Sequence, residues 1–176
     1  MADIEWPWQY QFPPFFTIQP NIETRKKQIE AWCSLVLSYT RQQKTYSIDV
    51  RESQNSPLFN NKAINRKLSM DCILTVLEEL RKTGHLEWTD NKTKKQCLVM
   101  WRTPEEWGKL IYSWICSRSM NNTVCTLFEL TEGEESEGTE FHGLENWLLL
   151  RALKSLESQE LAELMSFDGS DGVKFF

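Results

Sequence analysis

An internal repeat is the feature that most constrains how this 176-residue chain folds. When the sequence is aligned with itself at a shift of 76 positions, the patterns of the two halves match without a gap over the last third of each half. Leu77 then lies on Leu153, and Glu87 lies on Glu163. A repeat of this length is typical of one folding unit used twice. We therefore expect two domains.

The order of elements in the first half follows from spacing and capping residues. Apolar residues at three-four spacing predict a helix over 23–43. Ser69 is a good N-cap for a second, strongly amphipathic helix that Gly84 ends. The remaining expected elements are a short strand at 45–50, a small helix near 62–68, and a hairpin whose strands are 85–89 and 96–101.

The second half repeats this order. Thr103 is the predicted cap of a helix that has Pro104 at its first position. A strand that runs into a small helix follows at 122–130, and a strong helix is expected over 143–159. Two strands, ELAELMSF and GVKFF, are joined by the turn residues DGSDG.

Helix, strand, small helix, helix and two-stranded hairpin is the winged-helix order, in which a helix-turn-helix carries a β-hairpin wing. The expected fold class is α+β, with two tandem winged-helix domains after an extended proline and aromatic arm. The arm is assigned to residues 1–22, the first domain to 23–102 and the second domain to 103–176.

Charge argues against DNA binding, which many winged helices perform. Residues 1–102 hold 15 Lys and Arg against 11 Asp and Glu, a net of +4, whereas residues 103–176 hold 5 against 14, a net of −9. Duplex affinity comes largely from phosphate neutralisation, which the second half does not supply. The hairpin lysines Lys92, Lys94 and Lys95 leave the idea open for the first half, although a solvated turn explains them better.

Catalytic motifs are lacking in the sequence. There are two histidines and five cysteines, and no cysteine spacing matches a zinc ribbon or a redox pair. No Gly-rich phosphate loop and no G-x-S-x-G motif occur. We expect a protein that is not an enzyme, has no cofactor and no metal, and keeps its thiols reduced in the cytosol.

The opening stretch EWPWQYQFPPFF crowds aromatic residues around three prolines without any helical or strand period. The Pro13-Pro14 pair favours an extended, polyproline-like backbone, from which Phe15 and Phe16 project toward a pocket on another subunit. Trp6 and Trp8 are further candidate anchors. The alternative, in which the arm folds back onto its own domain, is left open and is weighted more heavily for Trp6, Trp8, Tyr10 and Phe12.

Several longer motifs carry a resemblance over essentially the whole chain. They are WPWQYQFPPFFTIQPN, the WCSLVL helix, NSPLFNN, the VLEELRKTGHLEW segment, PEEWGKLIY and the terminal DGSDGVKFF. With these motifs the chain resembles the vacuolar protein sorting twenty-five family. That family is the smallest subunit of ESCRT-II, the second endosomal sorting complex required for transport.

The resemblance implies two tandem winged helices that bind proteins, with two copies attached to two different larger subunits of a Y-shaped complex. The family's proline-aromatic motif, which docks on those subunits, maps onto Pro13, Pro14, Phe15 and Phe16. The family's second winged helix recruits the first ESCRT-III subunit for sorting of ubiquitinated cargo into multivesicular bodies.

A basic amphipathic helix would complement the acidic second half and its loop TEGEESEGTE. We assign the acidic margin of that site to Glu134, Glu135, Glu137 and Glu140. Location is expected to be cytoplasmic with recruitment to endosomal membranes, and membrane contact is expected to be indirect, since net negative charge opposes anionic lipid. The alternative is a winged-helix factor associated with transcription, with a nuclear pool.

Overall fold

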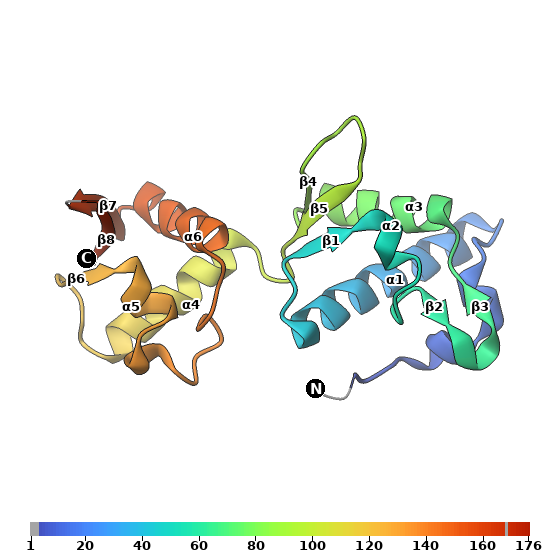
Figure 1. Cartoon of the computed structure of the whole chain (residues 1–176), viewed down its shortest axis with the longest axis horizontal. Coiled ribbons are helices and arrows are strands. Elements are labelled where there is room, and N and C mark those ends of the chain that lie inside the picture. The colour runs from blue at the N-terminus through green and yellow to red at the C-terminus, as the bar shows by residue number, and fades with distance from the viewer. Residues whose placement is uncertain (1–3, 168) are drawn as a thin grey trace. The chain divides into compact units, whose positions relative to one another are not determined.

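The computed structural model describes residues 4–167 and 169–176. The chain divides into two compact units, one that ends at Trp101 and one that begins at Arg102. Both units mix helices with a small antiparallel sheet (Figure 1).

The first unit begins with two short 3₁₀ helices in the arm and continues with a long helix. Its elements are η1 (Trp8–Gln11), η2 (Pro13–Phe16), α1 (Ile22–Gln43), β1 (Ser47–Asp49), α2 (Val50–Ser53), β2 (Asn60–Asn61), η3 (Lys62–Ile64), β3 (Arg66–Lys67), α3 (Met70–Lys82), β4 (Leu86–Trp88) and β5 (Gln96–Val99). The strands β1, β5 and β4 form one sheet in that order, and β2 pairs with β3.

The two N-caps predicted from the sequence, Ser69 and Thr103, are confirmed. The Ser69 side chain accepts a hydrogen bond from the Cys72 backbone N–H at the start of α3. Thr103 accepts one from the Glu106 N–H at the start of α4. Beyond α3, Gly84 takes a left-handed φ of 85°, which glycine adopts at little cost and which lets the chain turn into β4.

The second unit contains the same kinds of element. They are α4 (Pro104–Ser117), β6 (Val124–Thr126), α5 (Leu127–Thr131), η4 (Glu134–Ser136), α6 (Asn146–Ser158), β7 (Ala162–Phe167) and β8 (Ser170–Phe175). The strand order β6-β8-β7 matches that of β1-β5-β4. Leu148, Leu149, Ala152, Leu153 and Leu156 form the buried face of α6.

The 76-residue shift reappears in the structure. α3 spans residues 70–82 and α6 spans 146–158, so the two helices have the same length at that shift. In the hairpins, Leu86 pairs with Val99 and Ala162 pairs with Phe175, again in corresponding positions. The repeat therefore preserves strand register as well as helix length.

Two expected details are wrong. The small helix of the first unit is α2 at Val50–Ser53, directly after β1, whereas the segment near 62–68 forms only the 3₁₀ turn η3 followed by β3. The residues DGSDG do not form a separate connection between the last two strands, because Ser170–Phe175 already belongs to β8. Asp168, in that turn, lies outside the described residues.

Candidate partner-binding surfaces

The arm folds back onto α1, which overturns the expectation that Phe15 and Phe16 project from an extended stalk. Phe15 and Phe16 are only 5% and 4% exposed. The ring of Phe15 stacks on Trp32 with centroids 4.3 Å apart, and Phe16 meets the same indole edge-on at 5.2 Å. Residues 13–16 form the 3₁₀ turn η2, not polyproline. A proline φ near −65° suits both conformations, so tertiary packing decides between them.

Gln28 of α1 holds the backbone of the arm. Its side-chain amide donates to the carbonyls of Phe15 at 2.9 Å and Thr17 at 2.8 Å, and its Oε1 accepts from the Gln19 N–H at 3.1 Å. The indole N–H of Trp32 also donates to the Phe15 carbonyl, at 2.9 Å. These bonds satisfy buried backbone groups of the non-repetitive arm that would otherwise destabilise it. Sequence reasoning missed Gln28, because a lone glutamine in a helix carries no pattern.

Tyr10 connects the start of the arm to β2 and to the segment just before it. Its hydroxyl donates to the Pro57 carbonyl, and Asn61 Nδ2 donates to the Tyr10 carbonyl at 2.6 Å. The Trp6 ring stacks on Tyr10 at 3.9 Å and is half-buried. Burial raises the pKa of Tyr10 to about 12. The arm is thus part of the core of the first unit at both ends.

An apolar face remains outside this packing. Trp8 is 71% exposed and Phe12 is 49% exposed, and their rings lie 5.8 Å apart. Pro13 and Pro14 are also exposed. We call these four residues, Trp8, Phe12, Pro13 and Pro14, the arm face. Beside it, a groove of about 500 Å³ opens between the arm and α1. Of the predicted anchors, Trp8, Pro13 and Pro14 therefore lie on the surface.

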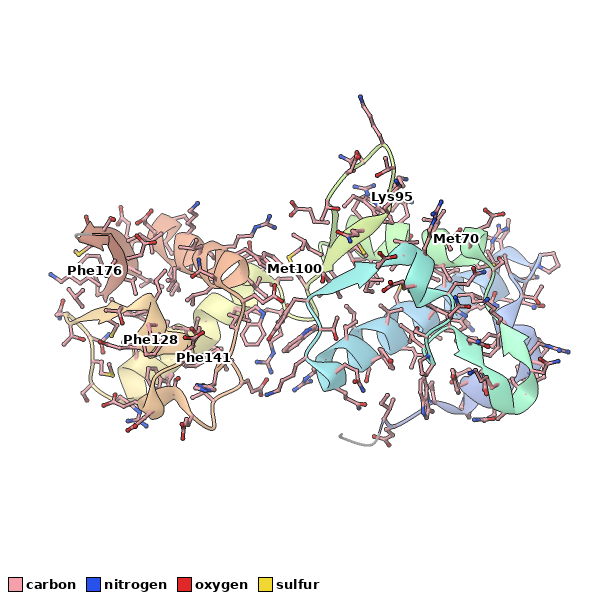
Figure 2. The ribbon with its side chains drawn as sticks, viewed as in Figure 1. Met70, Lys95, Met100, Phe128, Phe141 and Phe176 are labelled. Atoms are coloured by element: carbon pink, nitrogen blue, oxygen red, sulfur yellow. The ribbon has the colours of Figure 1, made fainter. Side chains whose placement is uncertain are left out.

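The second unit has an acidic pocket of about 470 Å³. Trp114, Met120 and Leu130 contribute apolar surface, and Glu129, Glu134 and Glu135 contribute carboxylates. The ring of Phe141, labelled in Figure 2, packs edge-on against Trp114 with centroids 5.4 Å apart and supports the pocket wall. Glu129 was missed in the sequence because it lies on α5, outside the acidic loop.

The other two predicted carboxylates differ from Glu134 and Glu135. Glu140 forms an ion pair with Arg102 at 2.5 Å, and Glu137 is exposed at the end of η4 without lining the pocket. Arg118 lies over the Trp114 ring, 5.1 Å from its centroid, and donates to the Glu135 carbonyl. Arg118 therefore lies beside the pocket that Glu129, Glu134 and Glu135 line.

Metal-binding clusters are not found among the described residues. No group of three His, Cys, Asp or Glu side chains there is arranged to hold a metal ion. All five cysteines are free thiols, and burial raises the pKa of Cys33 and of Cys97 to about 12. No helix in the described part of the chain is long and apolar enough to cross a bilayer.

Comparison with known proteins decides the family. A sequence profile described as ESCRT-II complex subunit matches residues 9–145, which include Phe12, Pro13 and Pro14 of the arm face, the rest of the first unit after them and the acidic pocket. The chain belongs to this family. The resemblance noted from the sequence is thereby confirmed, and the ESCRT-II family is a family of structural complex subunits.

Relatives of this ESCRT-II subunit match it over nearly their whole length. The vacuolar protein-sorting-associated protein 25 of Danio rerio is 60% identical over 98% of both chains. The human protein of that name is 58% identical over 98% of this chain and 97% of its own. A crystal structure of subunit VPS25 of the endosomal trafficking complex ESCRT-II has a TM-score of 0.82 at 30% identity, covering 97% of this chain and 98% of that one.

A second solved structure contains a whole complex. A chain of the endosomal complex ESCRT-II (VPS22/VPS25/VPS36) matches with a TM-score of 0.78 at 30% identity, over 96% of this chain and 98% of that chain. The mixed helix and sheet architecture described above is thus the architecture of an ESCRT-II subunit.

Proposed function

We propose that this ESCRT-II subunit is a non-enzymatic assembly protein built from two winged helices. Support comes from the order of elements, which is helix, strand, short helix, helix and hairpin in each unit. The three-stranded sheets have the same strand order, and each hairpin forms the wing. The proposed domains are an arm over residues 1–22 and winged helices over 23–102 and 103–176.

The first unit docks on larger winged-helix subunits of the complex, which correspond to VPS22 and VPS36 of the solved assembly. The observation that carries this proposal is the arm face, an apolar surface held in one conformation by the buried residues beneath it. Ordering an arm on binding weakens affinity, so an arm that is already ordered favours it. Trp8, Phe12, Pro13 and Pro14 make the contact, while Phe15 and Phe16 shape the surface from below.

The second unit recruits an ESCRT-III subunit through a basic amphipathic helix. The acidic pocket supplies both parts of such a site, apolar surface from Trp114 and Met120 and carboxylates from Glu129, Glu134 and Glu135. Glu137 belongs to the outer acidic margin, whereas Glu140 holds Arg102 within the unit. Duplex DNA is not a partner of this unit, since residues 103–176 carry a net charge of −9.

In the cell, the protein acts in the cytoplasm and is recruited to endosomal membranes through its partners. There, ESCRT-III recruitment by the second unit serves the sorting of ubiquitinated cargo into multivesicular bodies. Two copies of the chain per complex would present two such recruitment sites, so weak single contacts gain avidity.

Native mass spectrometry of the chain co-expressed with the two larger subunits tests this proposal. The expected assembly holds two copies of this chain and one of each larger subunit, and it captures a basic ESCRT-III helix. Trp8→Ala combined with Phe12→Ala should leave free chain and a complex of the larger subunits alone. An assembly that forms equally well with the double variant would contradict docking through the arm face.

A further inference from the structure

The residues that line the groove between the arm and α1 indicate which kind of partner side chain binds there. We propose that it binds an apolar side chain of a larger ESCRT-II subunit that is followed by an Asp or Glu, whose carboxylate pairs with Lys27. This inference rests on the proposed docking of the arm face and adds the kind of residue that the partner must present.

The walls of the groove are built for an apolar side chain. Phe15 and Ala31 contribute to the lining, and the exposed rings of Trp8 and Phe12 form part of its rim. The volume of about 500 Å³ lies within the range of roughly 300–1,000 Å³ that is typical of binding pockets. Aromatic and aliphatic anchors in such pockets dominate the binding energy of many protein interfaces.

Two amide side chains in the lining, those of Gln19 and Gln28, are already hydrogen-bonded. Gln28 is bonded to the arm backbone as described above, and Gln19 Nε2 donates to the carbonyls of Pro14 at 3.0 Å and Thr17 at 2.9 Å. These two side chains stabilise the conformation of the arm that forms the groove, and their amide groups are bonded within the chain. A partner therefore finds apolar surface beside the ammonium group of Lys27, together with the polar side chains of Gln9 and Thr24.

Lys27 is the one charged residue that lines the groove in the described part of the chain. It is exposed, and it makes no ion pair with any described residue. A cation at the rim of an apolar groove complements a carboxylate that follows an apolar anchor, and such rim charges act mainly on the association rate.

The test uses the full-length chain and the purified pair of larger subunits, with binding kinetics recorded by biolayer interferometry. Lys27→Glu should slow association about tenfold at 0.1 M salt, and the difference should vanish at 1 M, where the Debye length is only ~3 Å. Lys26→Glu is the matched control, because it makes the same charge change one residue away and outside the groove. The control should stay within about twofold of the wild type.

Carbodiimide cross-linking of the wild-type complex provides the second readout. It joins ammonium and carboxylate groups in direct contact, so mass spectrometry should find Lys27 linked to an Asp or Glu of a larger subunit. A link from Lys27 only to carboxylates of this chain, or equal slowing by both lysine variants, overturns the inference.

A third comparison separates this inference from the function on which it rests. If Trp8→Ala with Phe12→Ala abolishes binding while Lys27→Glu behaves like wild type, the groove chemistry is wrong and arm-face docking stands. If all these variants bind like wild type, docking through the arm face fails, and the groove inference fails with it.

Discussion

The indole of Trp32 lies parallel to the phenyl ring of Phe15, with 4° between their planes and 4.3 Å between their centroids. The same indole donates its N–H to the Phe15 carbonyl. One residue of α1 therefore holds both the ring and the backbone of the arm. The arm is a structural part of the first unit, and its outer face is free to bind.

Phe15→Ala should destabilise the first unit by about 3–5 kcal/mol, since it removes a buried aromatic ring and leaves a cavity against Trp32. Urea denaturation followed by tryptophan fluorescence measures the change. Phe12→Ala is the matched control, because Phe12 is half-exposed in the same arm, and it should change the free energy of unfolding far less. Equal effects of the two variants would show that Phe15 is not a core residue.

Gln28→Ala should lower the free energy of unfolding by about 1–3 kcal/mol, because it leaves the buried carbonyl of Phe15 with fewer donors and strands the Gln19 N–H. Gln11→Ala removes an exposed amide from the arm and should stay within about 0.5 kcal/mol of wild type. Chemical denaturation of both variants measures the difference. A Gln28 variant as stable as the Gln11 variant would argue against the clamp.

Alkaline pH should destabilise the first unit through Tyr10. Burial raises the pKa of the Tyr10 phenol from 10.0 to about 12, so the fold favours the neutral form. Its contribution to stability is complete below pH 10 and is lost as the pH rises toward 12. The urea midpoint of unfolding should therefore fall between pH 9.5 and pH 11.5, and it should fall less in Tyr10→Phe than in wild type. The thiols that titrate in this range are common to both proteins, so identical pH slopes would refute the role of Tyr10.

Glu134→Gln combined with Glu135→Gln should slow association of a basic amphipathic ESCRT-III helix about tenfold at 0.1 M salt. The two carboxylates line the acidic pocket, whereas the Glu140 carboxylate is held by Arg102. Glu140→Gln is therefore the control and should leave the association rate nearly unchanged. Surface plasmon resonance on the full chain records both rates. Association that responds more to Glu140 than to the pocket pair would move the site away from the pocket.

The sequence predicts the strong helices and the hairpins well. Both α3 and α6 have apolar residues at helical spacing, α3 also has the Ser69 cap, and the lengths of the two helices repeat at a 76-residue shift. The sequence did not predict all of the short elements correctly. The four-residue α2 is shorter than any helical period that a pattern reveals. The conformation of the arm was also not predicted, because Pro13 and Pro14 allow two backbone states and the choice depends on Trp32 and Gln28, which lie far along the chain.

The candidate site residues were likewise predicted only in part from the sequence. Aromatic content marked the arm as a binding segment, but only tertiary packing separates Trp8 and Phe12, which are exposed, from Phe15 and Phe16, which are buried. Charge marked the acidic loop, while the ion pair of Glu140 and the pocket position of Glu129 depend on the fold.

Titration calorimetry of the full-length chain against the larger ESCRT-II subunits tests the central claim most directly. Trp8→Ala with Phe12→Ala should weaken binding by at least about 100-fold, since two aromatic anchors at a hot spot contribute on the order of 2 kcal/mol each. The melting temperature should stay near that of wild type, because both rings lie outside the core. Wild-type affinity in this double variant would contradict the assignment of the arm face as the docking surface.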